Sequence, residues 1–277
     1  MKIWIIWSSI ADFHLMSHLH NLDHEYHVFL DNRFGERGQQ QSADAEKRLK
    51  ACLELAKDCD LIIVPPVYEI LILQSDDSEY KKYNQKVASL FSSLIQNHIL
   101  PYSIVGKIGL IGPRHHQDLF QNHWNTLKSD YTPTDHQANN KHFQSQIPLY
   151  PIPTDHWNIL YTLDKSWFVN KLIKDDLAKF KDYNIDTVLA LDRGYLKQGK
   201  TIKQKFHNKI RRYDEKVVFG ILDTLLETHW TSSVVSKYSV TVNYTGDDHF
   251  MNNKVFKRTL ARGKSTEVRL QKIETLI

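Results

Sequence analysis

The sequence predicts an α/β fold with mostly parallel sheets. Short apolar runs rich in β-branched residues alternate along the chain with segments whose apolar residues recur at helical spacing. This alternation is typical of parallel sheets covered by helices. With 277 residues, 41% hydrophobic and 25% charged, the chain can form one large domain or two lobes, each with its own core.

The predicted strands are short runs dominated by Ile, Val and Leu. Two of them begin after Asp60 and Asp186 and end in polar or turn-forming residues, which is how buried parallel strands deliver side chains to a site. We predict strands at 3–7, 27–30, 61–64, 108–111, 187–191, 217–222 and 240–244, with 147–152 as a short strand or extended segment.

Helices are predicted where apolar residues follow the i, i+3, i+4, i+7 pattern. The pattern runs from Leu49 to Ala56 behind a candidate cap at Ser42, and it recurs over 80–95 and 168–180. The segment 197–212 combines an apolar stripe with many lysines and arginines, as a solvated surface helix does. Residues 129–158 show little periodicity, which predicts irregular connections.

Composition narrows the class of protein. A net charge of +4 permits an anionic ligand but does not call for nucleic acid. The longest apolar stretch, 61–73, contains two prolines and Glu69 and is shorter than the roughly 20 residues of a membrane-spanning helix. We therefore expect no membrane association and a cytoplasmic location. Cys52 and Cys59 would lie roughly 10 Å apart on one helix, so we expect two buried free thiols and no disulfide.

The histidines give no metal-binding pattern. His123, His136, His142 and His156 are scattered without the spacing that a metal site requires. The sequence therefore predicts no metal site.

Seven segments form a further pattern along nearly the whole chain. They are 3–9, 30–38, 60–68, 107–116, 147–152, 186–195 and 242–250. Their order and spacing resemble those of the aspartate/glutamate racemase superfamily, glutamate racemase most closely. Individual motifs differ from the family's: the strand ends read Trp7-Ser8-Ser9, Pro66-Val67-Tyr68 and Asp192-Arg193-Gly194-Tyr195.

The resemblance implies two similar α/β lobes facing across a cleft. Residues 1–98 with 206–277 would form the first lobe, and 99–205 the second. The family needs no cofactor, because one cysteine from each lobe serves as acid or base. Pro66 and Asp192 stand at those positions here, and we expect them to face one another across the cleft. Cysteine-dependent racemisation of glutamate or aspartate is therefore expected to be absent.

The resemblance also places a set of residues at the cleft. Asp192 is the candidate acid or base, although it can equally pair with Arg193 or cap a helix. His115 or His116 can serve as a base near neutral pH, or belong to a solvated helix start. The predicted ligand-binding residues are Ser8, Arg37, Gly38, Pro66, Val67, Tyr68, Arg114, His115, His116 and Arg193.

Two functions follow, with a third left open. The first is a racemase-like protein without the two-cysteine machinery that binds a small anionic metabolite or a partner, a second copy of the chain included. The second is an isomerase- or lyase-type enzyme acting on an amino or carboxylic acid, with Asp192 as acid or base. The third is an interaction protein with an inert cleft. Arg37, Arg114 and Arg193 favour a carboxylate or phosphate ligand, unless they pair internally with Asp31, Glu36 or Asp192.

Overall fold

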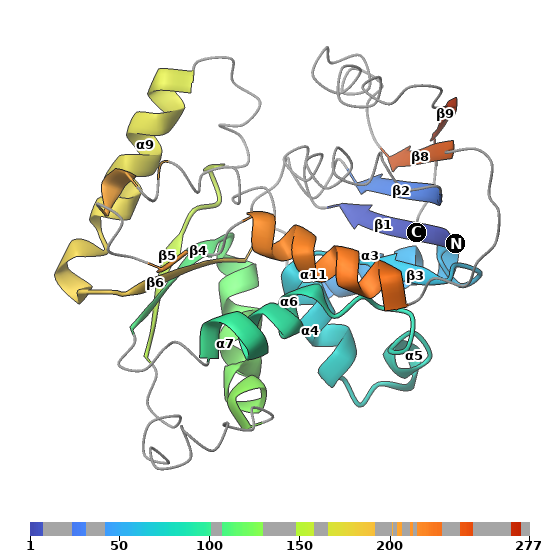
Figure 1. Ribbon diagram of the computed structural model, residues 1–277, viewed down its shortest axis with the longest axis horizontal. Coiled ribbons are helices and arrows are strands. Elements are labelled where there is room, and N and C mark those ends of the chain that lie inside the picture. The colour runs from blue at the N-terminus through green and yellow to red at the C-terminus, as the bar shows by residue number, and fades with distance from the viewer. Residues whose placement is uncertain are drawn as a thin grey trace. The chain divides into compact units, whose positions relative to one another are not determined.

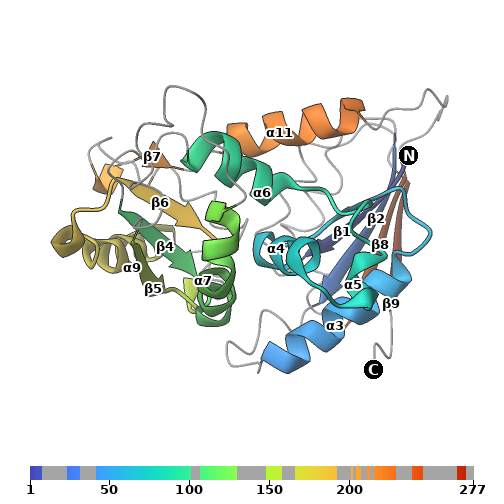
Figure 2. The same ribbon diagram turned by 90° about the horizontal axis from the view of Figure 1, so that it is seen from below.

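The computed structural model describes residues 1–7, 24–31, 42–100, 107–129, 148–157, 166–191, 201, 204–206, 211–212, 215–228, 239–245 and 267–272. The chain divides into two compact units. One comprises Met1–Ala88 and Asp223–Ile277, and the other comprises Ser89–Leu222. Figures 1 and 2 show the two sheets around which the units are built.

The first unit holds a five-stranded sheet in the order β3-β1-β2-β8-β9. Every neighbouring pair is parallel, and Ile3 and Ile5 of the inner strand β1 are completely buried. Continuous apolar runs suit such a position because helices can cover both faces of a parallel sheet. The strand bounds are β1 Lys2–Trp7, β2 Glu25–Asp31, β3 Leu61–Ile63, β8 Ser239–Thr245 and β9 Glu267–Lys272.

Three helices of the first unit follow β2 and β3 along the chain. They are α3 Ser42–Leu55, α4 Pro66–Gln74 and α5 Ser78–Lys81. Helix α4 starts with a proline at its first position, where the missing N–H costs no hydrogen bond. Leu49, Cys52, Leu53 and Ala56 are all buried, so the predicted apolar face behind Ser42 is confirmed.

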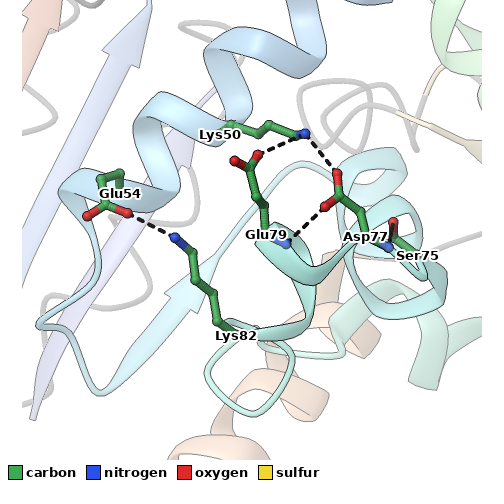
Figure 3. A network of polar contacts seen from close by, with 6 residues as sticks. All are labelled: Lys50, Glu54, Ser75, Asp77, Glu79 and Lys82. Carbon is green, nitrogen blue, oxygen red and sulfur yellow. Dashed lines mark hydrogen bonds and ion pairs between the residues drawn. The ribbon is translucent and has the colours of Figure 1, made fainter.

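A surface network ties α3 to the segment around α5 (Figure 3). Lys50 of α3 contacts Asp77 at 2.8 Å and Glu79 at 2.9 Å. One helical turn further on, Glu54 contacts Lys82 at 3.1 Å. The Asp77 carboxylate also accepts a hydrogen bond from the Glu79 backbone N–H and thereby caps α5. The network joins the surfaces of α3 and α5, although exposed ion pairs contribute little to stability individually.

The apolar spacing over 80–95 predicts one helix, and this prediction is wrong. The chain instead forms α5, a turn, α6 Leu90–Leu94 and the π-helix η2 Ile95–Ile99. Between them Val87 bridges to Ile62, and the Ala88 N–H donates to the Ile62 carbonyl at 2.8 Å. This stretch satisfies backbone groups on the outer edge of β3, which an uncovered edge strand would leave unpaired.

The second unit holds a four-stranded parallel sheet in the order β5-β4-β6-β7. The strands are β4 Ile108–Gly112, β5 Leu149–Pro153, β6 Thr187–Ala190 and β7 Arg211–Arg212. Helices α7 Arg114–Ser129 and α9 Ser166–Ala178 lie on opposite sides of this sheet (Figure 2), and the 3-10 helix η6 Lys181–Tyr183 follows α9.

Helix α9 covers the sheet face that carries Gly109, Ile111, Val188 and Ala190. A Cβ atom at Gly109 would come within 2.9 Å of the Phe180 ring, so a glycine here permits the close packing. On α7, Phe120 packs edge-on against Phe91 of α6 at 5.9 Å between ring centroids.

Three further expectations need correction. Residues 217–222 belong to helix α11, Glu215–Thr228, and not to a strand. Val218, Leu222 and Leu226 are buried at helical spacing, and a short apolar run cannot distinguish the two structures by itself. Arg211 and Arg212 form β7, so the basic helix does not extend to them. Strand β9 was not predicted, although Val268 and Leu270 alternate with polar residues.

The fold class is confirmed, since both sheets are parallel and alternate with helices along the chain. The other predicted strands, including the extended segment 147–152, correspond to β1–β6 and β8. The helices that the structure describes include none with the length and apolar character needed to span a bilayer.

Candidate functional site at the carboxyl edge of the second sheet

The strands β4, β5 and β6 end together at one edge of the second unit's sheet. Gly112 pairs with Pro153, and Ile111 pairs with Ala190, so the three strands finish at the same level. The residues that follow them therefore meet at this edge. Because ligands in open α/β sheets bind beyond the carboxyl ends of parallel strands, this edge is the candidate site.

Backbone hydrogen bonds extend the sheet by one residue on each side of β4. The Thr154 N–H donates to the Gly112 carbonyl at 2.9 Å, and the Leu191 N–H donates to the Ile111 carbonyl at 2.9 Å. The residues immediately beyond β5 and β6 are thus held in place by the end of β4. Leu191 is buried and directly precedes Asp192.

The first turn of α7 projects from β4 through Pro113. Its first N–H, that of Arg114, donates to an Asp155 carboxylate oxygen at 3.0 Å. Proline at the position before the helix has no polar side chain, so a residue 41 positions away supplies the cap. The Asp155 charge also suits the positive end of the helix dipole.

The two histidines of this turn lie against each other but differ in burial. Their ring centroids are 4.3 Å apart. Burial lowers the pKa of His116 well below its ordinary value; the neighbouring His115 lowers it further, and a hydrogen bond with the Leu191 backbone opposes the shift. His116 is thus a neutral core residue that joins α7 to the end of β6.

His115 is half-buried and remains at the surface of the site. Burial lowers its pKa, while the charges of Asp155 and Asp118 oppose that shift. A neutral imidazole beside carboxylates can accept a proton near neutral pH. Of the two histidine rings, only that of His115 is partly exposed.

Arg114 is exposed at the same turn. Within the described part of the chain its guanidinium takes part in no ion pair, and its backbone N–H donates to Asp155. The N–H at the helix start is therefore occupied, while no described residue takes up the donors of the guanidinium.

A residue that the sequence analysis missed fixes α7 on the sheet. Gln117 is buried, and its amide nitrogen donates to the Ile152 carbonyl at 2.7 Å and to the Leu110 carbonyl at 3.3 Å. In the sequence, the one sign of this role is a glutamine on the buried side of a helix, which does not reveal the carbonyl groups that it binds.

The carboxyl edge of the first unit's sheet carries the other described candidates. Pro66 and Tyr68 are buried in the first turn of α4, which is separated from the end of β3 by two residues. Val67 belongs to the same turn, and its side chain lies outside the described part. The sequence analysis also missed Glu69, whose side chain is only 1% exposed although it stands in an apolar run.

The remaining predicted site residues lie outside the described residues. They are Ser8, Arg37, Gly38, Asp192 and Arg193. The expectation that Pro66 and Asp192 face one another stays a prediction, as does the role of Asp192.

Both cysteines are free and buried, as predicted. Cys59 lies before β3, at the amino end of that strand, and Cys52 lies within α3. Burial raises the pKa of the Cys59 thiol to about 11. In the described part of the chain, no group of three or more His, Cys, Asp or Glu side chains is arranged to hold a metal ion.

Comparisons with known proteins agree with this fold. The sequence matches no protein-family model and no curated protein. Among solved structures, glutamate racemase isoform RacE1 from Bacillus anthracis is similar with a TM-score of 0.72 and 14% identity, covering 100% of this chain and 98% of that one.

Two ligand-bound structures are similar as well. Glutamate racemase from Francisella tularensis in complex with D-glutamate gives a TM-score of 0.66 at 14% identity, covering 99% of this chain and 97% of that one. The Escherichia coli enzyme in complex with L-glutamate and the activator UDP-MurNAc-ala gives 0.60 at 13%, covering 99% and 98%. The likeness establishes the glutamate racemase fold for this chain.

Proposed function

We propose that this protein binds a small carboxylate- or phosphate-bearing metabolite beside the first turn of α7, without two-cysteine racemisation. The observation that carries the proposal is the exposed Arg114 guanidinium at the carboxyl edge of the sheet, with no ion pair among the described residues. Guanidinium groups bind carboxylates and phosphates through paired hydrogen bonds.

The position of Asp155 refines this proposal. Its carboxylate already occupies the Arg114 backbone N–H, so this N–H is not available to a second anion. The ligand's anionic group would therefore lie on the guanidinium side of the turn. The F. tularensis and E. coli structures hold glutamate, a dicarboxylate, which supports testing organic acids first.

The absence of two-cysteine chemistry is part of the same proposal. Cys59 is buried and its raised pKa keeps the thiol protonated at neutral pH, while Pro66 follows the carboxyl end of β3 where the family resemblance expects a thiol. The thiolate is the reactive form of cysteine, so neither Cys59 nor Pro66 offers the required base.

Thermal-shift measurements against a panel of organic acids and phosphates test the binding proposal. A ligand at 100 times its dissociation constant stabilises by roughly 2.7 kcal/mol, which corresponds to a rise of about 5–10 °C in Tm. Arg114→Gln keeps the backbone N–H and should abolish the shift. Lys174→Gln, which removes an exposed charge from α9 of the same unit, should leave it unchanged. A shift that survives Arg114→Gln, or no shift with any anion, would refute the proposal.

The second candidate is an isomerase- or lyase-type enzyme using the same edge. The observation in its favour is His115, a half-buried neutral imidazole beside Asp155; Asp192 remains the other proposed acid or base. Solvent deuterium exchange at the Cα of glutamate and aspartate tests it. We expect no exchange, and exchange that is lost in both His115→Gln and Asp192→Asn would favour the enzyme instead.

A further inference from the structure

The turn after β5, residues 154–157, is held by backbone contacts at its start. The Thr154 N–H donates to the Gly112 carbonyl at 2.9 Å, and the Trp157 N–H donates to the Thr154 carbonyl at 2.9 Å. Trp157 is completely buried in the core that α9 forms with the sheet. The turn is therefore compact and anchored in the interior of the second unit.

A single carboxylate on α9 holds the side chains of this turn. Asp176 accepts hydrogen bonds from the Trp157 indole N–H at 2.7 Å and from Lys179 at 2.7 Å, and it pairs with His156 at 2.8 Å. Its side chain is 10% exposed. Burial raises the pKa of Asp176, but the bonds from Lys179 and Trp157 and the charge of His156 outweigh burial and lower it overall. The group is consequently an ionised carboxylate with its acceptor oxygens occupied.

Between the anchored ends of the turn lies Asp155, whose carboxylate caps α7 at the Arg114 N–H. The residues that contact the two helices are therefore consecutive in the chain. Asp155 contacts the start of α7, while His156 and Trp157 contact Asp176 of α9. We propose that Asp176 is a positioning residue, which places Asp155 on the first turn of α7 and thereby fixes Arg114 and His115 at the candidate site.

Asp176 acts through the turn, because its hydrogen bonds and ion pairs among the described residues go to Trp157, Lys179 and His156 and not to Arg114 or His115. Loss of Asp176 should therefore loosen the start of α7 and leave the rest of that helix unchanged. A purely structural role would loosen the whole unit. The consequence for ligand binding rests on the proposed function, whereas the consequence for α7 does not.

Amide hydrogen exchange measured by NMR separates these cases without any ligand. In Asp176→Ala, the Arg114 amide should exchange about fivefold faster, which is the change expected for loss of a helix cap. The amide of Phe120, in the middle of α7, should keep its rate. The control Asp175→Ala, an exposed carboxylate next to Asp176 on α9, should change neither amide.

Equal acceleration at both amides, or no acceleration at Arg114, would overturn the positioning role. If Asp176→Ala does not fold, Trp157→Phe takes its place. This variant removes one of the three contacts of Asp176 and keeps an aromatic ring in the core, and the exchange rates of the Arg114 and Phe120 amides are measured in it as before. In the anion screen, Asp176→Ala should also reduce the shift that depends on Arg114. Faster exchange at Arg114 with an unreduced anion shift would overturn the link between the turn and binding, while leaving the anion proposal itself intact.

Discussion

Replacing His116 with glutamine should make the stability of the second unit less sensitive to acid. In the folded protein this ring is buried between α7 and the end of β6, and its pKa lies well below the ordinary value of 6.5. In the unfolded chain the ring regains its ordinary pKa. The unfolded state therefore binds more protons than the folded state once the pH falls below 6.5.

The sign and size of the effect follow from this difference in proton binding. Stability rises with pH wherever the unfolded state binds more protons, so the contribution of His116 is present above pH 6.5 and is lost on acidification. The slope cannot exceed about 1.36 kcal/mol per pH unit for one group. Between neutral pH and pH 5 the loss is at most about 2 kcal/mol, reached if the ring stays neutral throughout.

Urea unfolding at pH 7 and at pH 5 measures this quantity as the difference between the two free energies of unfolding. In His116→Gln the difference between the free energies of unfolding at pH 7 and pH 5 should be smaller than in the parent by up to about 2 kcal/mol. This holds whatever stability the substitution removes at pH 7. His98→Gln removes an exposed histidine of the same unit and should leave the difference as it is in the parent. An equal pH difference in His116→Gln and the parent would show that His116 is not held neutral and that its placement at the end of β6 is incorrect.

The other predictions concern packing and reactivity. Gly109→Ala should destabilise the protein by about 1–3 kcal/mol because the new Cβ would lie 2.7 Å from Ile185. Gly220→Ala, within α11, should stabilise it by about 0.5–1 kcal/mol because nothing packs within 4 Å of the new Cβ. If urea unfolding showed that both variants change stability in the same direction, this reasoning would be wrong. Gln117→Ala should cost about 1–3 kcal/mol in the same assay by removing two bonds to carbonyls of the sheet. Cys59 should not react with a thiol reagent at neutral pH until the protein is unfolded, and reaction of the native protein would contradict its burial.

Most strands of the two sheets could be predicted from the sequence because buried parallel strands carry continuous apolar runs. The same property caused the error at 217–222, where buried positions of α11 happen to be contiguous with other apolar residues. The segment 80–95 failed for a different reason: its spacing is helical, but backbone pairing of Val87 with Ile62 outweighs local preference. Tertiary contacts of this kind leave no periodic trace in the chain.

The place of Arg114, His115 and His116 after a strand was predictable from the sequence, whereas their arrangement was not. The resemblance of segment 107–116 to a family strand indicated that these residues follow a strand, and in the structure they come just beyond β4. What the sequence could not indicate is that the histidines divide into one buried and one half-buried ring, or that Asp155 supplies the cap from another connection. Both depend on distances between segments that are far apart in the chain.

The likeness to glutamate racemases at 14% identity has a physical explanation that also limits what it implies. The fold depends on apolar runs and on backbone pairing, which many sequences satisfy, whereas a reaction depends on a few side chains beyond the strand ends. In this chain β4, β5 and β6 pair in parallel. Arg114 after β4 contacts Asp155 after β5, and the neighbouring His156 contacts Asp176 of α9. The cap from Asp155 and the bonds to Asp176 fix groups at this edge that a solvated loop would leave free. The anion screen with Arg114→Gln therefore tests whether this arrangement binds a ligand, and the deuterium-exchange assay with His115→Gln tests whether it supports chemistry.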